Sequence, residues 1–248
     1  MGINHLYPFM ARMEVMGLDC GGSLIHPKFV LSSKHCFVNF SENCFVNGSP
    51  TGNCAAILGD HSADYNDVGE QRVTITKVHT AKMTGSDLAI AELERPVELS
   101  KTIGLIKVSS RKLKRGDVVT TAGWGIVGYN KQTQMHMGLA DILRHTNLTV
   151  SQGGEGEQVT TYVNYTGPIP IDTCSGDSGG GLFSKNKAGD WEVHGSLYGG
   201  GYDCRLDILR GGGGRWNSVL PHLDWLLHPV VNYYFNKLDS ETKVLFTF

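Results

Sequence analysis

One serine lies in a segment that brings the backbone unusually close to any bound substrate. Residues 172–180 read Asp, Thr, Cys, Ser, Gly, Asp, Ser, Gly, Gly, so Ser178 follows one glycine by two positions and directly precedes two more. Glycine has no Cβ and adopts backbone conformations closed to other residues, which lets neighbouring N–H groups point outward. A hydroxyl presented at such a bend suits acyl transfer, with Ser178 as the nucleophile.

A serine nucleophile needs a base to take its proton and a carboxylate to orient that base. His35, beside Cys36, is the candidate base, and Asp87 begins the apolar run 87–93 as the candidate acid. The chain order is therefore His35, Asp87, Ser178. That order is typical of the chymotrypsin type of triad, whereas subtilisin and the α/β-hydrolases have other orders.

Four ordered blocks extend this pattern over most of the chain. They are the segment 20–36 around His35, DLAI at 87–90, TAGWG at 121–125 and DTCSGDSGG at 172–180. Together they make the chain, from Tyr7 to about His228, resemble a trypsin-like serine protease of the chymotrypsin family. The resemblance implies an all-β fold of two six-stranded antiparallel β-barrels with a C-terminal helix, and an active site between the barrels.

The expected organisation is a peptidase domain over residues 1–231 followed by a tail. The resemblance places the first barrel at about 7–107, the second at about 108–218 and the helix at about 219–228, and it gives the tail at 232–248 no role. The residues agree with an all-β chain, since short runs rich in Val, Ile and Thr recur between turn residues. These runs cover residues 27–33, 55–59, 71–78, 87–93, 116–124, 144–150, 157–165 and 191–198. Helical signal occurs only at 218–229, where Leu220, Leu223 and Leu227 share one face and Pro229 is expected to end the helix.

The resemblance assigns each site residue a role. His35 takes the proton of Ser178 as that hydroxyl attacks a peptide carbonyl, and Asp87 holds the imidazole in the required tautomer. The N–H groups of Gly176 and Ser178 form the oxyanion hole. The expected activity is that of a serine endopeptidase that works through an acyl-enzyme.

A specificity pocket is expected six residues before the nucleophile. Asp172 stands at the position that forms the pocket floor in trypsin-like relatives, and Ser196 and Gly214 resemble its walls. A buried carboxylate there favours substrates with Arg or Lys before the cleaved bond. Arg215, beside Gly214, is positioned in the sequence to pair with Asp172 and weaken that preference.

The six cysteines are even in number and include no close CxxC pair with the spacing of a zinc site. The resemblance pairs Cys20 with Cys36 and Cys174 with Cys204, and we expect Cys44 and Cys54 to pair locally. Disulfides imply an oxidising compartment, so the protein is expected to be secreted, and four N-x-[ST] patterns suit that location. The patterns begin at Asn39, Asn47, Asn147 and Asn164.

The beginning of the chain gives two further expectations. Residues 1–13 contain no signal peptide, and the activating sequence of family zymogens is also absent. The chain is therefore expected to be N-terminally truncated. In the family a new N-terminal ammonium pairs with the acid before the serine, which is Asp177 here, so without that partner the oxyanion hole is expected to stay unformed.

Composition excludes several kinds of partner. Charged residues make up 19% of the chain, the net charge is −2, and no apolar run reaches the length of a membrane helix. We expect polypeptide substrates, protein protease inhibitors and a monomer, with neither nucleic acid nor membrane as a partner. No cofactor is expected to be required, although Asp60, Asp67 and Glu70 have the spacing of the calcium loop of some family members, and their oxygen ligands suit Ca²⁺.

The alternative function is that of a catalytically silent homologue acting as a protein-binding module on the same fold. A complete set of triad residues, together with Gly176 and Asp172, favours the enzyme, because a binding module does not need all five at once.

Overall fold

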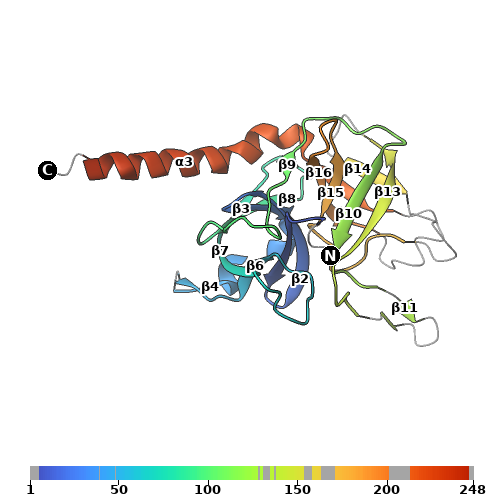
Figure 1. Cartoon of the computed structure of the whole chain (residues 1–248), viewed down its shortest axis with the longest axis horizontal. Helices are drawn as coiled ribbons and strands as arrows, with labels where there is room; N and C mark the ends of the chain where they lie inside the picture. Colours follow the sequence, from blue (N-terminus) through green and yellow to red (C-terminus); the bar gives the residue numbers. More distant parts are fainter. Residues whose placement is uncertain are drawn as a thin grey trace.

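Two β-barrels and a long C-terminal helix form the part of the chain that the structure describes (Figure 1). The structure is a computed structural model. It describes residues 6–38, 40–47, 49–127, 129–130, 135–136, 138–153, 158–162, 171–200 and 213–245.

The first barrel is a closed ring of antiparallel strands in the order β1-β2-β3-β8-β7-β6. Its strands are β1 (Met10–Val15), β2 (Leu18–His26), β3 (Phe29–Ser33), β6 (Cys54–Leu58), β7 (Gln71–Thr80) and β8 (Leu88–Leu93). Val73 and Ile75 are buried while Thr74 and Thr76 are only half-buried, which confirms the alternation expected of a barrel strand. Between β3 and β6 lie the 3₁₀ turn η2 (Lys34–Phe37), the short helix α1 (Phe40–Asn43) and the hairpin of β4 (Phe45–Val46) and β5 (Ser49–Pro50).

The second barrel closes in the order β15-β10-β13-β14-β17-β16, since β16 also pairs with β15. Its strands are β10 (Val118–Gly123), β13 (Arg144–Gln152), β14 (Gln158–Tyr162), β15 (Gly181–Lys185), β16 (Trp191–Gly199) and β17 (Arg215–Ser218). A short strand, β9 (Lys107–Val108), adds to β16 in parallel, and β11 (Tyr129–Asn130) pairs with β12 (Met135–His136) outside the barrel. The expected fold of two six-stranded antiparallel barrels and a helix is therefore confirmed.

All eight expected strand segments contain a strand, but four barrel strands have no counterpart among them. These are β1, β2, β15 and β17. Strand β15 contains no Val, Ile or Thr and β2 contains only Ile25, and both have glycine where close packing needs a small residue. A Cβ on Gly181 would lie 2.0 Å from the ring of Phe183, for example.

An apolar cluster joins the two barrels. Phe9 and Leu31 of the first barrel and Phe183 and Val193 of the second are all at most 1% exposed, and they belong to one buried cluster that also includes Leu226 of the C-terminal helix. The Phe9 and Phe183 rings meet edge to face with centroids 4.9 Å apart. The relative position of the barrels is thus fixed by packing, which matters because the candidate site draws residues from both.

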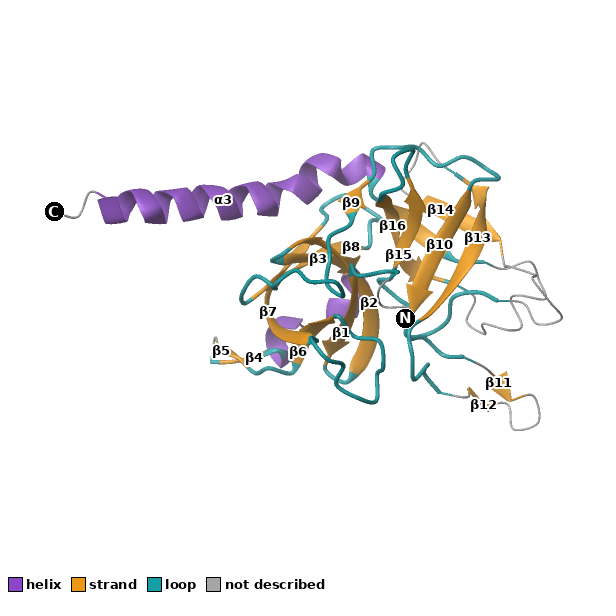
Figure 2. Ribbon diagram, viewed as in Figure 1, coloured by secondary structure: helices purple, strands orange, loops and turns teal. Residues whose placement is uncertain are grey.

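The C-terminal helix is longer than the sequence predicts. After the 3₁₀ turn η3 (Leu220–His222), α3 runs over Leu223–Leu245 and extends away from the barrels (Figure 2). The expectation that Pro229 ends the helix is wrong. Proline removes one backbone hydrogen bond, but Tyr233 and Tyr234 continue the helix across the β2–β3 turn, where the Tyr234 hydroxyl lies 3.0 Å from His26 Nε2.

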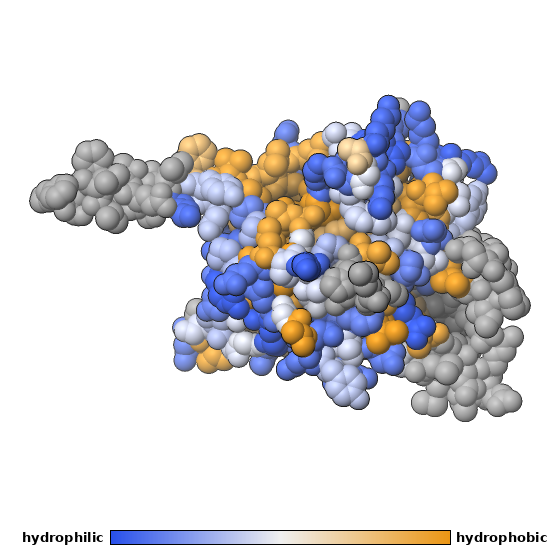
Figure 3. All heavy atoms as spheres, viewed as in Figure 1, coloured by the Kyte–Doolittle hydropathy of each residue, from blue (hydrophilic) through white to orange (hydrophobic). Residues whose placement is uncertain are grey.

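The buried face of α3 also differs from the expected one. Leu226 is 2% exposed and packs against the barrels, whereas Leu227 is 60% exposed. Apolar side chains gather along the first half of α3 and over the adjoining barrel surface (Figure 3), and Val231 and Phe235 are among those exposed. Within the described residues, no helix combines the length and the apolar composition needed to cross a bilayer.

Candidate active site

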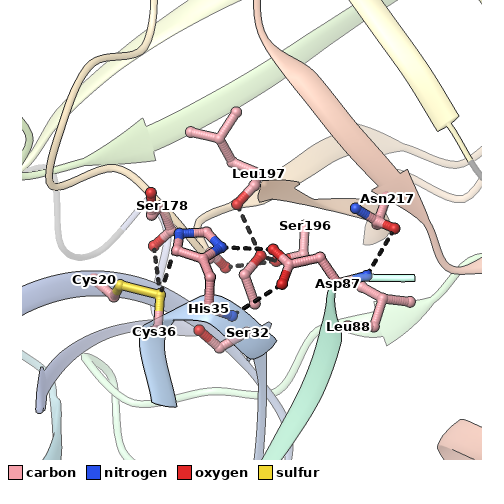
Figure 4. A network of polar contacts seen from close by, with 12 residues as sticks. Cys20, Ser32, His35, Cys36, Asp87, Leu88, Ser178, Ser196, Leu197 and Asn217 are labelled. Carbon is pink, nitrogen blue, oxygen red and sulfur yellow. Dashed lines mark hydrogen bonds and ion pairs between the residues drawn. A yellow bond between two sulfur atoms is a disulfide. The ribbon is translucent and has the colours of Figure 1, made fainter. Parts of the chain in front are cut away.

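His35 and Asp87 form a hydrogen-bonded pair at the edge of the first barrel. The carboxylate Oδ2 of Asp87 lies 2.5 Å from His35 Nδ1, and its Oδ1 accepts the His35 backbone N–H at 2.9 Å (Figure 4). The Lys34 N–H donates to the Asp87 carbonyl at 2.6 Å, so base and acid are held together by three contacts. The side chain of His35 is 39% exposed, which leaves its ring accessible to a substrate. Lys34 itself is exposed and needs no buried partner.

Ser178 reaches this pair from the second barrel. Figure 4 shows Ser178 beside the His35 ring, and both the His35 Nε2 and the Ser178 carbonyl oxygen lie within 4 Å of Cys36 Sγ, at 3.9 and 3.8 Å. The Gly21 N–H of β2 donates to the Ser178 carbonyl at 2.6 Å and anchors the serine loop to the first barrel. Among the described residues the Ser178 hydroxyl makes no hydrogen bond. Catalytic hydrogen bonds are often long in the absence of substrate, so the missing bond does not exclude His35 as the base for Ser178.

The turn at Ser178 contains the two N–H groups that are expected to form an oxyanion hole. Gly176 has φ +95° and Gly179 has φ +81°, both in the left-handed region that favours glycine. Within the described part of the chain, neither the Gly176 nor the Ser178 N–H donates a hydrogen bond, whereas the Asp177 N–H bonds to the Cys174 carbonyl at 3.0 Å. The two free donors are those expected for an oxyanion hole.

Asp177 points into a pocket made of backbone. Its Oδ1 accepts the Gly125 N–H at 2.8 Å and its Oδ2 accepts the Cys174 N–H at 2.9 Å. A Cβ on Gly123 would lie 2.1 Å from Oδ1, which explains why the TAGWG block needs its glycines. Burial raises the pKa of Asp177 to about 6 in spite of both N–H donors, and no ion pair joins this carboxylate to another described residue.

The expected pocket residues lie close to one another. The N–H groups of Thr173 and Gly214 donate to the Asp172 carboxylate, and the Thr173 bond measures 2.8 Å. Burial, with a smaller contribution from the nearby Asp177, raises the pKa of Asp172 to about 6 although the N–H donors oppose the change. Arg215 is exposed and forms no ion pair with Asp172, so the expected interference between these two described residues does not occur.

Ser196, expected on the pocket wall, has a side chain that is bonded within the protein. It is fully buried, and its hydroxyl donates to the Gly179 carbonyl at 3.1 Å and lies 2.9 Å from the hydroxyl of Ser33. Ser33 in turn donates to the Leu197 carbonyl at 2.8 Å, and Leu197 packs in the second barrel core. Sequence reasoning missed Ser33, which links the strand before His35 to the strand behind the pocket.

Two of the three expected disulfides are confirmed. Cys20 is bonded to Cys36, which closes the segment that carries the base, and Cys44 is bonded to Cys54. Cys174 is also disulfide-bonded, but its expected partner Cys204 lies outside the described residues. With these sulfurs oxidised, the close grouping of Cys20, Cys36 and the His35 ring is not a metal site.

The acidic loop brings its three carboxylates together. One oxygen each from Asp60, Asp67 and Glu70 lies within 4.8 Å of the others. Asp67 Oδ2 accepts the N–H groups of His61 and Ser62, at 2.6 and 2.8 Å, and Asp60 Oδ2 pairs with the Arg12 Nε at 2.5 Å. The other oxygen of Asp60 is buried and has no hydrogen-bond partner among the described residues.

Comparison with known proteins places this geometry in a family. A family model described as trypsin matches residues 3–212. The chain belongs to the trypsin family. Similar proteins include brachyurin from Leptuca pugilator, 28% identical over 174 residues that cover 66% of this chain and 70% of the relative. The thrombin-like enzyme elegaxobin-1 from Protobothrops elegans is 26% identical over 229 residues, 89% of each chain, and kallikrein-15 from Saguinus oedipus is 25% identical over 201 residues, 72% of each.

Proposed function

We propose that the protein is a serine endopeptidase that cleaves peptide bonds through His35, Asp87 and Ser178. The observation that carries the proposal is the His35–Asp87 pair, joined by two hydrogen bonds, facing a serine on a left-handed glycine turn from the other barrel. Family membership supports it, because trypsin-family homologues are serine endopeptidases.

In the proposed reaction the Ser178 Oγ attacks the peptide carbonyl carbon while its proton passes to His35 Nε2. The oxyanion that forms accepts the N–H groups of Gly176 and Ser178. The C–N bond then breaks as the proton passes to the leaving amine, which leaves an ester on Ser178. Water, deprotonated by His35, hydrolyses the ester and restores the serine. Asp87 stays ionised and keeps the Nδ1–H of the imidazole directed toward itself.

We further propose cleavage after Arg or Lys. The Asp172 carboxylate at the pocket floor would pair with the cationic side chain of the substrate. The side chain of Arg215 is exposed and does not pair with Asp172, so the carboxylate is available to the substrate. Comparing peptides that carry Arg, Phe or Ala before the cleaved bond tests this directly, and equal rates for all three would reject the cationic preference.

The test of the catalytic assignment compares the native chain with Ser178→Ala. A serine-directed fluorophosphonate should label the native chain and leave the variant unlabelled, with peptide hydrolysis lost in the variant. Folding of the variant is checked by its Tm. A variant that still hydrolyses peptides refutes the nucleophile, and a folded native protein isolated with its mature N-terminus that neither labels nor cleaves would favour the protein-binding module instead.

We propose that activity requires a cation at Asp177, supplied by a new N-terminus released on cleavage of a zymogen. The carboxylate has two N–H donors and a raised pKa, and a buried charge with no counter-ion is costly. An ammonium seated there would keep the Gly176–Ser178 turn in the geometry that binds the oxyanion. Sequencing the N-terminus of active protein isolated from its source tests the proposal.

Secretion and the kinds of partner are also proposals. Disulfides at Cys20–Cys36 and Cys44–Cys54 suit an oxidising compartment, and Asn47 and Asn147 are exposed as glycosylation would require. Asn39 and Asn164 lie outside the described residues. We propose polypeptide substrates and protein inhibitors for a monomer that binds neither nucleic acid nor membranes. Glycan analysis and the molar mass of the purified native protein check these points.

A structural calcium ion in the acidic loop is a separate proposal, and the activity itself is proposed to need no cofactor. The three carboxylates of Asp60, Asp67 and Glu70 converge, and the partnerless buried oxygen of Asp60 is suited to a cation. Arg12 already occupies the other oxygen of Asp60 and supplies part of the positive charge. Adding Ca²⁺ should raise the Tm of the native chain but not that of Asp67→Asn. A Tm that changes neither on addition of calcium nor on addition of a chelator would refute the proposed calcium site.

A further inference from the structure

Asn217 is a fully buried polar residue that contacts the candidate triad from the opposite barrel. It lies on β17 of the second barrel and is 0% exposed. Its Oδ1 accepts the backbone N–H of Asp87 at 3.1 Å, across 130 positions of sequence (Figure 4). No other described residue of the second barrel bonds to Asp87, because the remaining bonds of this acid go to His35 and Lys34.

The strand that carries Asn217 is rigid. Within the closed second barrel β17 lies between β14 and β16, with Asn217 paired to Gln158 on one side and to Ser196 on the other. A side chain on a strand bonded along both edges holds its position better than one on a loop. Asp87 lies just before β8 in the first barrel. Its backbone N–H is therefore bonded to a residue whose position is set by the strands of the second barrel.

Stability alone does not explain an asparagine at this position. Its Nδ2 is buried and has no hydrogen-bond partner among the described residues. Leaving such a donor unsatisfied costs about 1–3 kcal/mol, which is as much as or more than the bond from the Asp87 N–H to Oδ1 contributes, about 0.5–1.5 kcal/mol. The atom of the Asn217 side chain that does form a hydrogen bond is Oδ1, which accepts the Asp87 N–H.

We infer that Asn217 is a positioning residue that sets the orientation of the Asp87 carboxylate toward His35. The inference rests on the proposed endopeptidase function. Without the Oδ1 acceptor, the Asp87 N–H is left unpaired in the barrel interface and the acid can rotate to find another partner. The 2.5 Å contact to His35 Nδ1 would then lengthen, and small misplacements of catalytic groups cost up to about 10²-fold in rate.

The test compares Asn217→Leu with Ser218→Ala. Leucine keeps the volume and removes the acceptor, and Asn217→Ala removes the same acceptor if the leucine variant does not fold. Ser218 is the matched control, since it is buried on the same strand and its hydroxyl accepts the Leu220 N–H at 3.3 Å without touching the triad. Each rate is divided by the concentration of active sites, which is measured by titration with a fluorophosphonate. A smaller amount of folded protein therefore does not lower the kcat obtained.

For Asn217→Leu we expect kcat on an amide substrate to fall by about 10- to 100-fold with KM within about twofold of native. A one-dimensional proton NMR spectrum reports the same bond independently of activity, because the His35 Nδ1–H in a short charge-assisted bond resonates far downfield. That resonance should shift or broaden in Asn217→Leu and persist in Ser218→Ala.

The two proposals fail in different ways. An unchanged kcat per site and an unchanged downfield resonance in a folded Asn217 variant would overturn the positioning role while leaving the endopeptidase intact. A native protein with its mature N-terminus that shows neither hydrolysis nor labelling would overturn the endopeptidase, and the NMR comparison would still decide whether Asn217 orients the His35–Asp87 pair.

Discussion

Replacing Asp177 by asparagine tests whether the acid before the nucleophile lacks a counter-ion. Its carboxylate is held by the N–H groups of Gly125 and Cys174, and burial raises its pKa to about 6. At neutral pH the Asp177 carboxylate is therefore ionised in both states, but its ionisation costs more free energy in the folded chain than in the unfolded chain. Asparagine has nearly the same shape and no charge at any pH.

The size of the effect follows from the two pKa values of Asp177. Between 3.8, the ordinary value, and about 6, the folded chain binds a proton that the unfolded chain has released. The free energy of unfolding of the native chain therefore falls as pH rises through this window and is constant above it. The difference in pKa corresponds to about 3 kcal/mol. Relative to native, Asp177→Asn should gain about 3 kcal/mol of stability from about pH 4 to about pH 7.

Urea unfolding followed by tryptophan fluorescence, from about pH 4 to about pH 8, measures this difference. Raised acids that do not interact with Asp177, such as Asp60, contribute equally to both proteins and cancel. The pKa of Asp172 falls when the Asp177 charge is removed, which adds to the stability gained by the variant in the same pH range. Asp117→Asn is the control with the opposite sign. Partial burial disfavours the charge of Asp117, but the Lys114 N–H and the Arg111 side chain lower its pKa, so its removal should destabilise the chain at neutral pH and matter less in acid.

A stability difference between Asp177→Asn and native that does not change with pH would refute the reasoning. The amide nitrogen of asparagine cannot accept one of the two N–H groups, but that cost is the same at every pH and only offsets the difference. A flat difference would mean that the N–H groups around the carboxylate compensate its charge fully, and that no cation is needed there.

Three further changes address the turn, the pocket and the helix. Gly176→Ala forces a Cβ onto a backbone with φ +95°, so kcat per titrated site should fall about 10²-fold, and native kinetics would exclude an oxyanion role for this turn. Asp172→Ser should lower kcat/KM for Arg substrates by at least about 10²-fold and for Ala substrates much less, and a uniform loss in both would point to misfolding of the pocket. Ending the chain at Asn232 removes the ring contact of Tyr233 with His26, so calorimetry should show a Tm lower by several degrees, whereas an unchanged Tm would leave the helix extension without a stabilising role.

The parts of the site that the sequence predicts are those with a restricted chemistry. A nucleophile, a base and an acid must be of a few residue types, and the turn at Ser178 requires glycine where φ is positive, as at Gly176 and Gly179. Asn217 and Ser33 are common polar residues in ordinary strand segments. Their importance comes from bonds to residues 130 and 163 positions away, which no local pattern can indicate.

The errors in the fold have a similar physical origin. Pro229 is a strong signal for the end of a helix, but the aromatic contacts of Tyr233 and Tyr234 with the β2–β3 turn outweigh one lost backbone hydrogen bond. Strand β2 is not recognised because packing requires its two glycines, Gly22 within its own barrel and Gly21 against the opposite one. A Cβ on Gly21 would lie 2.8 Å from the backbone of Gly180, so tertiary packing decides the residue type there.

In the candidate triad, His35 and Asp87 are hydrogen-bonded to each other, whereas the Ser178 hydroxyl forms no hydrogen bond to either of them. His35 and Asp87 are tied within the first barrel by the Lys34 N–H and by both carboxylate oxygens, so a small shift between barrels moves them together. Ser178 follows the second barrel and is coupled to the first by the Gly21 N–H. Loosening the barrel interface should therefore change the Ser178–His35 distance first and leave the base–acid pair intact. Loss of Asn217 should instead lengthen the His35–Asp87 contact and leave the Ser178–His35 distance unchanged. The downfield resonance of the His35 Nδ1–H distinguishes the two cases.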